Sequence, residues 1–181
     1  MTDSKAKILS RLPQEEQDKF FASLSPEEAS LLIYDWEFWA RPEQLAPPGP
    51  WATRIHLSGR GWGKTLAGAQ WVRAEIESKR KRNVALVGAT SRDVRKVMVE
   101  GSSGILSICP PWDYPSYEPS KLKLTWPNGG EAHLYSAEEP SRLRGPNHDA
   151  AWCDEIASWE YIEETWDNLE MTLRAGRSPK R

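Results

Sequence analysis

The pattern of hydrophobic and polar positions changes near residue 50 of the chain. Residues 1–40 read as helical, and the clearest start signal is Ser25-Pro26-Glu27-Glu28, which combines a serine cap, a first-turn proline and a glutamate at the third helical position. A helix is therefore predicted from Ser25 to about Trp39. Its apolar residues are dense enough to predict packing against a main domain. Four prolines within residues 40–52 predict a stiff connector and a domain boundary.

From residue 53 onward, short apolar runs alternate with helical stretches, which is typical of an α/β protein. The pattern predicts strands at Arg54–Leu57, Val84–Val87 and Ala150–Cys153, helices over 64–79, 91–100 and about 159–173, and a hairpin with arms at 121–126 and 131–136. We therefore expect a helical extension (1–40), a connector (41–52) and a core (53–181) built on a mostly parallel sheet flanked by helices.

Composition adds little to this picture. The formal net charge of -2 and the charged fraction of 28% describe an ordinary protein surface, so any nucleic-acid contact must be a local patch. The two cysteines, Cys109 and Cys153, lie far apart, which fits a reduced cytoplasm and argues against a disulfide scaffold. No apolar run approaches the roughly eighteen residues that a membrane span requires.

The strongest chemical signal is a glycine-rich stretch between the first predicted strand and the following helix. Glycines let successive backbone N–H groups point at phosphate oxygens, and the start of the helix adds positive potential. Its residues are Ser58, Gly59, Arg60, Gly61, Trp62, Gly63, Lys64 and Thr65. They fit the pattern G-x-x-x-x-G-K-[ST], with serine replacing the first glycine. Lys64 would reach the β and γ phosphates of ATP, and Thr65 would ligate Mg²⁺. The alternative is a fortuitous glycine-rich turn.

A second signal lies about ninety residues further on, where the predicted strand Ala150–Cys153 ends in Asp154 and Glu155. An acid at a strand end beside a phosphate loop can hold magnesium, and a neighbouring glutamate can orient or deprotonate the attacking water. We assign Asp154 to the metal and Glu155 to the water. The alternative is a buried strand that ends in solvated acids. A water-activating glutamate favours an ATPase over a kinase, because a kinase must exclude water.

Arginines could complete the site, because charge accumulates on the transferring phosphoryl group. Arg60 inside the loop and Arg142 or Arg144 before the third strand are the candidates. Each of them could instead be a solvated surface group.

Several segments together resemble the large subunit of tailed-phage terminases, the motor that packages DNA. The loop with an internal arginine looks like the deviant phosphate loop of that family. The other similar segments are Leu143–Pro146, Asp154–Trp159, Arg41–Gln44 with Pro47–Gly49, and, more weakly, Val97–Gly101.

The resemblance implies a P-loop ATPase of the ASCE type that uses ATP and Mg²⁺ and acts in the cytoplasm of a bacterial host. Its implied partners are double-stranded DNA, the portal protein, the small terminase subunit and further copies of itself in a ring. Arg144 would be a finger offered to a neighbouring subunit, and Arg60 would act within its own subunit. Arg41 and Gln44 would contact adenine.

The chain also departs from that family. It ends at Arg181, before the last core strands and the nuclease domain that the family would imply. The acids Glu163, Glu164 and Asp167 have the spacing of a solvated helix face, and none of the histidines has a partner at metal-ligand spacing. Two other hypotheses therefore stay open: another P-loop DNA motor such as a helicase, and a truncated nucleotide-binding or assembly module without turnover.

Overall fold

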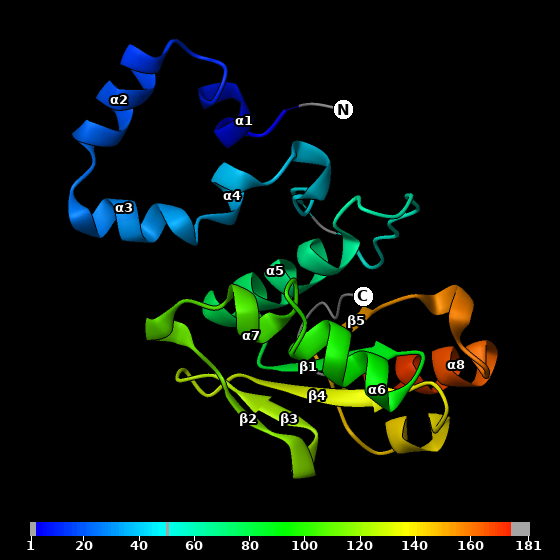
Figure 1. Ribbon diagram of the computed structural model, residues 1–181. Coiled ribbons are helices and arrows are strands. Elements are labelled where there is room, and N and C mark those ends of the chain that lie inside the picture. The colour runs from blue at the N-terminus through cyan, green and yellow to red at the C-terminus, as the bar shows by residue number, and fades with distance from the viewer. Residues whose placement is uncertain (1–2, 50, 175–181) are drawn as a thin grey trace. The chain divides into compact units, whose positions relative to one another are not determined.

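The computed structural model describes residues 3–49 and 51–174 (Figure 1). The chain divides into two compact units, Met1–Pro48 and Gly49–Arg181. No helix among the described residues is long and apolar enough to cross a membrane.

The first unit consists of short helices. They are α1 (Lys5–Leu9), α2 (Gln14–Ser23), α3 (Pro26–Ile33), α4 (Trp36–Trp39) and the 3-10 turn η1 (Pro42–Gln44). The first three contain no buried residue. Since little apolar surface is buried, these helices depend strongly on local signals at their ends.

The predicted helix from Ser25 to Trp39 starts where expected but is wrong in its length. The capping box is present: the Ser25 hydroxyl accepts a hydrogen bond from the Glu28 N–H (3.1 Å), and the Glu28 carboxylate accepts one from the Ser25 N–H (2.8 Å). The helix ends at Ile33, however, because the Asp35 carboxylate caps a new helix by accepting from the Phe38 N–H (3.3 Å). A second cap inside the apolar run therefore divides it into α3 and α4.

The second unit alternates strands and helices, as predicted. Its elements are α5 (Lys64–Glu77), β1 (Asn83–Gly88), α6 (Ser91–Asp93), the π-helix η2 (Val94–Val99), α7 (Ile105–Ile108), η3 (Pro111–Asp113), β2 (Ser116–Glu118), η4 (Pro119–Lys121), β3 (Lys123–Thr125), β4 (Glu131–Ser136), η5 (Pro140–Leu143), β5 (Ala150–Cys153), η6 (Ile156–Ser158) and α8 (Ile162–Thr172). The predicted helix over 91–100 is therefore a short α-helical turn that continues as a π-helix.

These strands form one mixed sheet in the order β2-β3-β4-β1-β5. Strand β1 is parallel to both neighbours, so that Leu86 lies opposite Leu134 of β4 and Trp152 of β5. The predicted hairpin is confirmed, because β3 pairs antiparallel with β4. Since β4, β1 and β5 run the same way, their carboxyl ends meet at one edge of the sheet, where parallel α/β sheets bind ligands.

Strand β1 is buried on both faces and divides the core in two. Val84 and Leu86 pack on the face covered by α5, η2 and α7, whereas Ala85 and Val87 pack on the face that carries α8 (Figure 1). A strand covered on both sides reads as a continuous apolar run, which explains why the sequence located β1 so well.

The predicted strand at Arg54–Leu57 is wrong, because these residues belong to no strand of the structure. Ile55 and Leu57 are 73% and 92% exposed. An apolar cavity of about 620 Å³ is lined by this segment and by β5, whose only paired neighbour among the described strands is β1. An apolar pattern favours a strand, but a strand forms only where a partner completes its hydrogen bonds.

Candidate functional site

The glycine-rich loop leads directly into α5. Gly61 and Gly63 have φ angles of +79° and +88°, a region that favours glycine, and Gly63 is the residue that caps α5. The Lys64 ammonium folds back along the loop and donates a hydrogen bond to the Ser58 carbonyl (3.0 Å). The loop therefore curls around its own lysine at the start of a fourteen-residue helix.

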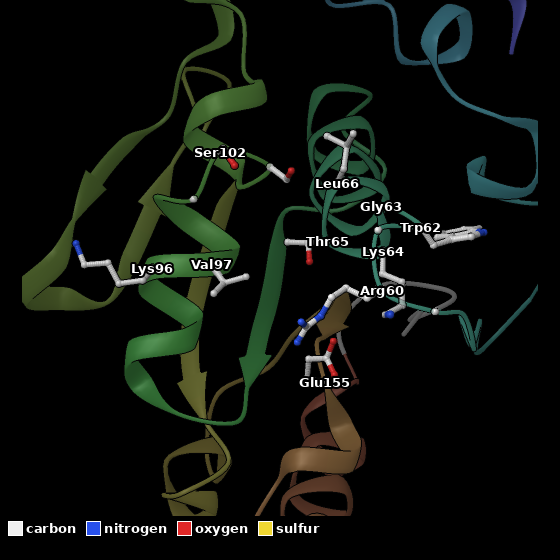
Figure 2. Close-up of a pocket in the computed structure, with 14 residues that line it drawn as sticks. Arg60, Trp62, Gly63, Lys64, Thr65, Leu66, Lys96, Val97, Ser102 and Glu155 are labelled. Carbon is white, nitrogen blue, oxygen red and sulfur yellow. The ribbon is translucent and has the colours of Figure 1, made fainter. Parts of the chain in front are cut away.

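A cavity of about 640 Å³ opens in front of this loop (Figure 2). Residues 59–66 form one wall. The other lining residues come from η2, from the turn that follows it and from the end of β5: Lys96, Val97, Gly101, Ser102, Ser103 and Glu155. The residues of the η2 wall were not among the site residues predicted from the sequence. The available signal was the weak family resemblance of Val97–Gly101, which had no chemistry attached to it.

Glycines give the η2 wall its close packing. A Cβ atom on Gly104 would lie 2.8 Å from the backbone oxygens of Val97 and Val99, and one on Gly101 would lie 2.7 Å from the Val97 oxygen. The turn after η2 therefore folds back against the carbonyl groups of the π-helix. Segments with π-helical hydrogen bonding are rare and are found frequently at functional sites.

Asp154 lies at the carboxyl end of β5 and faces the start of α5. Its backbone N–H donates to the Val87 carbonyl (2.9 Å), and its own carbonyl accepts from the indole N–H of buried Trp159 (3.0 Å). The side chain accepts a hydrogen bond from the Thr65 hydroxyl at 3.5 Å. Burial raises the pKa of the Asp154 carboxyl above its usual range, and the charge of Glu155 raises it further. The two residues predicted to hold the metal are thus brought together from positions 89 apart.

Glu155 has an unusual backbone conformation, with a φ angle of +47°. A non-glycine residue in this region costs on the order of 1 kcal/mol or more and is often found at functional sites. Its side chain lines the cavity in front of the loop, and Figure 2 shows the Arg60 guanidinium pointing toward it.

Gly68 brings α5 close to β5. A Cβ atom on Gly68 would lie 2.3 Å from two atoms of the Trp152 indole ring. Thr65 is one helical turn before Gly68, and Asp154 is two residues after Trp152. We therefore infer that this close packing helps to set the distance between the loop and the acid.

Arg142 and Arg144 do not line the cavity in front of the loop. Arg142 forms an ion pair with Glu139 (3.5 Å). The Arg144 guanidinium donates to the Glu164 carboxylate (3.0 Å) and to the Asn168 side-chain oxygen (3.2 Å), both on α8. Glu164 therefore has a specific partner and is not merely part of a solvated helix face.

Arg41 and Gln44 belong to the first compact unit. Gln44 is only 6% exposed, and its side-chain oxygen accepts a hydrogen bond from the Arg41 N–H (3.0 Å). Their contact with adenine stays a prediction.

The fold and the site together define a class of protein: an α/β sheet whose strand-end acid faces a glycine-rich loop at the start of a helix is the arrangement of phosphate-loop proteins. Residues 55–181 match the family described as "Terminase large subunit, T4likevirus-type, N-terminal". The chain therefore belongs to this family of phage DNA-packaging terminases. No curated protein sequence matches the chain.

Solved structures of phage terminases are similar in fold. The large terminase of a thermophilic bacteriophage is 15% identical with a TM-score of 0.55, and the match covers 83% of this chain and 36% of that one. The ATPase domain of the Thermus phage P74-26 large terminase is 19% identical with a TM-score of 0.52, covering 90% of this chain and 67% of that one. The first of these terminases has also been solved in complex with ADP, and that structure is 16% identical with a TM-score of 0.51, covering 83% and 36%. The chain thus spans 36% of the length of that large terminase.

Proposed function

We propose that this chain binds ATP with Mg²⁺ and hydrolyses it as the ATPase portion of a terminase large subunit, driving double-stranded DNA into the procapsid. The carrying observation is that Asp154 and Thr65 meet at 3.5 Å beside Lys64. Family membership and the ADP complex of the thermophilic phage terminase support the nucleotide. Double-stranded DNA, the portal protein, the small terminase subunit and a ring of further copies are the proposed partners.

The residues at the loop fit a magnesium ion in their chemistry. A hydroxyl and a carboxylate oxygen are ligands that Mg²⁺ prefers, and it commonly takes only one or two protein ligands beside phosphate oxygens and water. The buried Asp154 carboxylate has no cationic partner in an ion pair among residues 3–49 and 51–174. When bound, the ion would neutralise charge on the β and γ phosphates.

The chain's own groups would perform the remaining tasks. The Lys64 ammonium would exchange the Ser58 carbonyl for phosphate oxygens, and the amides of residues 59–65 would surround the phosphates. The Glu155 carboxylate would accept a hydrogen bond from the attacking water, orient it in line and take its proton. Arg60, which points toward Glu155 in Figure 2, would stabilise charge on the transferring group within the same subunit.

Two substitutions separate binding from turnover. We expect Glu155→Gln to keep ATP affinity, measured with a fluorescent ATP analogue, and to lower the turnover number about 10²- to 10⁴-fold. Lys64→Ala should weaken ATP affinity about 10- to 100-fold, because a charged hydrogen bond to phosphate is lost. The matched control is Glu163→Gln, which neutralises an exposed acid on α8 and should change neither quantity. Binding of ATP without any turnover that depends on Glu155 would support a silent nucleotide-binding module instead.

Arg144 is proposed as the finger that a subunit offers to its neighbour. Its absence from the lining of its own loop cavity supports action between subunits. Arg144→Ala should therefore lower the turnover of the chain assembled with portal and double-stranded DNA, by as much as about 10³-fold. Mixing Arg144→Ala with Lys64→Ala subunits should restore part of it, since one subunit supplies the loop and the other the finger. No recovery in verified mixed rings would contradict this role.

A further inference from the structure

The side chain of Arg144 is held by two neighbouring positions of one helix. Its Nε donates to the Asn168 Oδ1 (3.2 Å), and its Nη2 donates to the Glu164 Oε1 (3.0 Å). Glu164 and Asn168 are four residues apart, so they lie on the same face of α8. The third nitrogen, Nη1, forms no hydrogen bond or ion pair within the described ranges 3–49 and 51–174. Both contacts use one edge of the guanidinium, and the other edge is left available.

Asn168, which supports Arg144, is buried and hydrogen-bonded to a second residue. Asn168 is 6% exposed, and its amide also donates to the Pro140 carbonyl at the start of η5 (3.2 Å). One buried side chain therefore connects α8 to both ends of the 3-10 turn that leads to Arg144. Before Asn168 in α8, Thr165 donates to the Ala137 carbonyl (3.4 Å), and after it Thr172 contacts buried His148 (3.1 Å). Helix α8 is thus attached to the sheet on each side of Asn168.

Stability does not explain this arrangement. The ion pair between Arg144 and Glu164 is open to solvent, with side chains 64% and 52% exposed. Such a pair contributes about 0–1 kcal/mol to folding. The ion pair instead fixes the orientation of the Arg144 side chain. Because a long side chain that is already ordered has less entropy to lose on binding, it can bind a phosphate at a lower entropic cost.

We propose that Glu164 and Asn168 are positioning residues, which hold the Arg144 guanidinium ready for the phosphates bound by a neighbouring subunit. This inference rests on the proposed function of Arg144. Neither Glu164 nor Asn168 lines the cavity in front of the loop of its own subunit. A preorganised arginine speeds the chemical step and leaves the affinity of the neighbouring loop for ATP unchanged.

The test measures ATP turnover of the chain assembled with portal and double-stranded DNA, compared with that of the chain alone. Glu164→Ala should lower the stimulated turnover number about 3- to 10-fold, with an unchanged KM for ATP and an unchanged basal rate. The matched control is Glu163→Ala, which removes the adjacent exposed acid of the same helix. Glu164→Gln should recover part of the loss, because its amide oxygen can still accept from Nη2. Asn168→Ala should behave like Glu164→Ala, with thermal unfolding followed to confirm that the variant folds.

A double-mutant cycle decides between positioning and a structural role. In an Arg144→Ala background, Glu164→Ala should cause no further loss, since it acts through the arginine. Equal losses in both backgrounds would overturn the proposal, and so would a faster rate in Glu164→Ala, which would mean that Glu164 holds the arginine back. If Arg144→Ala keeps full stimulation, the finger and this inference both fail while ATP hydrolysis stands. A wild-type chain without turnover would instead refute the proposed function itself, and this inference with it.

Discussion

The two halves of the proposed site are built in opposite ways. The half formed by Thr65 and Asp154 is part of the core: Asp154 is 9% exposed, its pKa is raised by burial, and its backbone continues the β-sheet ladder. The half formed by Arg144 lies on the surface, and its partner Glu164 is also open to solvent. We infer that the first half is coupled to the stability of the fold, whereas the second half can be changed at little cost in stability.

The largest expected effect concerns His148, which joins the sheet to α8. Its side chain is fully buried between Tyr135 of β4 (3.2 Å) and Thr172 of α8 (3.1 Å), and burial lowers its pKa from 6.5 to about 4. The folded state therefore disfavours the protonated ring. The contribution of neutral His148 to the free energy of unfolding should be fully present above pH 6.5. It should decrease by up to about 3 kcal/mol as the pH falls to about 4.

Urea unfolding at several pH values between about 7 and 4 measures this dependence. The ionisable groups around the ring are Tyr135, His133 and Asp149. A His148→Gln variant, which cannot take up the proton, should lose most of the slope between pH 6.5 and about 4. If wild type and variant show the same slope, His148 does not make this contact sensitive to acid.

The next effect tests the close packing that sets the buried half. Gly68→Ala places a methyl group 2.3 Å from the Trp152 ring, so α5 or the indole must move. We expect a loss of about 1–3 kcal/mol in the free energy of unfolding, despite the better helix propensity of alanine, together with weaker ATP turnover. Gly59→Ala is the matched control for stability, because its Cβ would meet no atom within 4 Å. Equal stability of the two variants would show that the packing tolerates the methyl group.

A smaller effect is expected at Asp154, where the substitution should stabilise the fold, whereas Gly68→Ala should destabilise it. The raised pKa means that the folded protein favours the neutral acid, and the stability this gives below pH 3.8 is lost as the pH rises through the folded pKa. Asp154→Asn should therefore stabilise the nucleotide-free protein at neutral pH by about 1 kcal/mol, or about 2–4 °C in Tm, while abolishing turnover. Asp167→Asn, on the exposed side of α8, should change the Tm little. A lower Tm for Asp154→Asn would contradict the cost of burying this charge.

The smallest expected change in stability is that of Arg144→Ala. Since its ion pair is exposed, the free energy of unfolding should change by less than about 1 kcal/mol in urea. The control is Arg142→Ala, which removes the other exposed arginine of the same turn. A loss of several kcal/mol for Arg144→Ala alone would mean that the arginine holds α8 in place, and the contrast between the two halves would disappear.

The parts of the fold that the sequence predicted well carry local signals. The apolar run of β1, the alternating hairpin of β3 and β4 and the start of α5 each depend on residues close together in the chain. The errors arose where a distant or competing partner decides. The cap at Asp35 divides the helix predicted to reach Trp39, and the segment Arg54–Leu57 finds no ladder although its pattern favours one.

The sequence by itself determined which groups could do chemistry: a glycine-rich loop ending in Lys64 and Thr65, and two acids at the end of an apolar strand. These follow from residue type and order, which fix backbone freedom, charge and hydrogen-bonding capacity. Only the tertiary structure decided which groups meet. Thr65 meets Asp154 from 89 positions away, and Gly68 approaches Trp152 from 84 positions away. Arg144 is hydrogen-bonded to residues of α8 that are 20 and 24 positions away. Such pairings depend on sheet register and helix packing, which no single stretch of sequence contains.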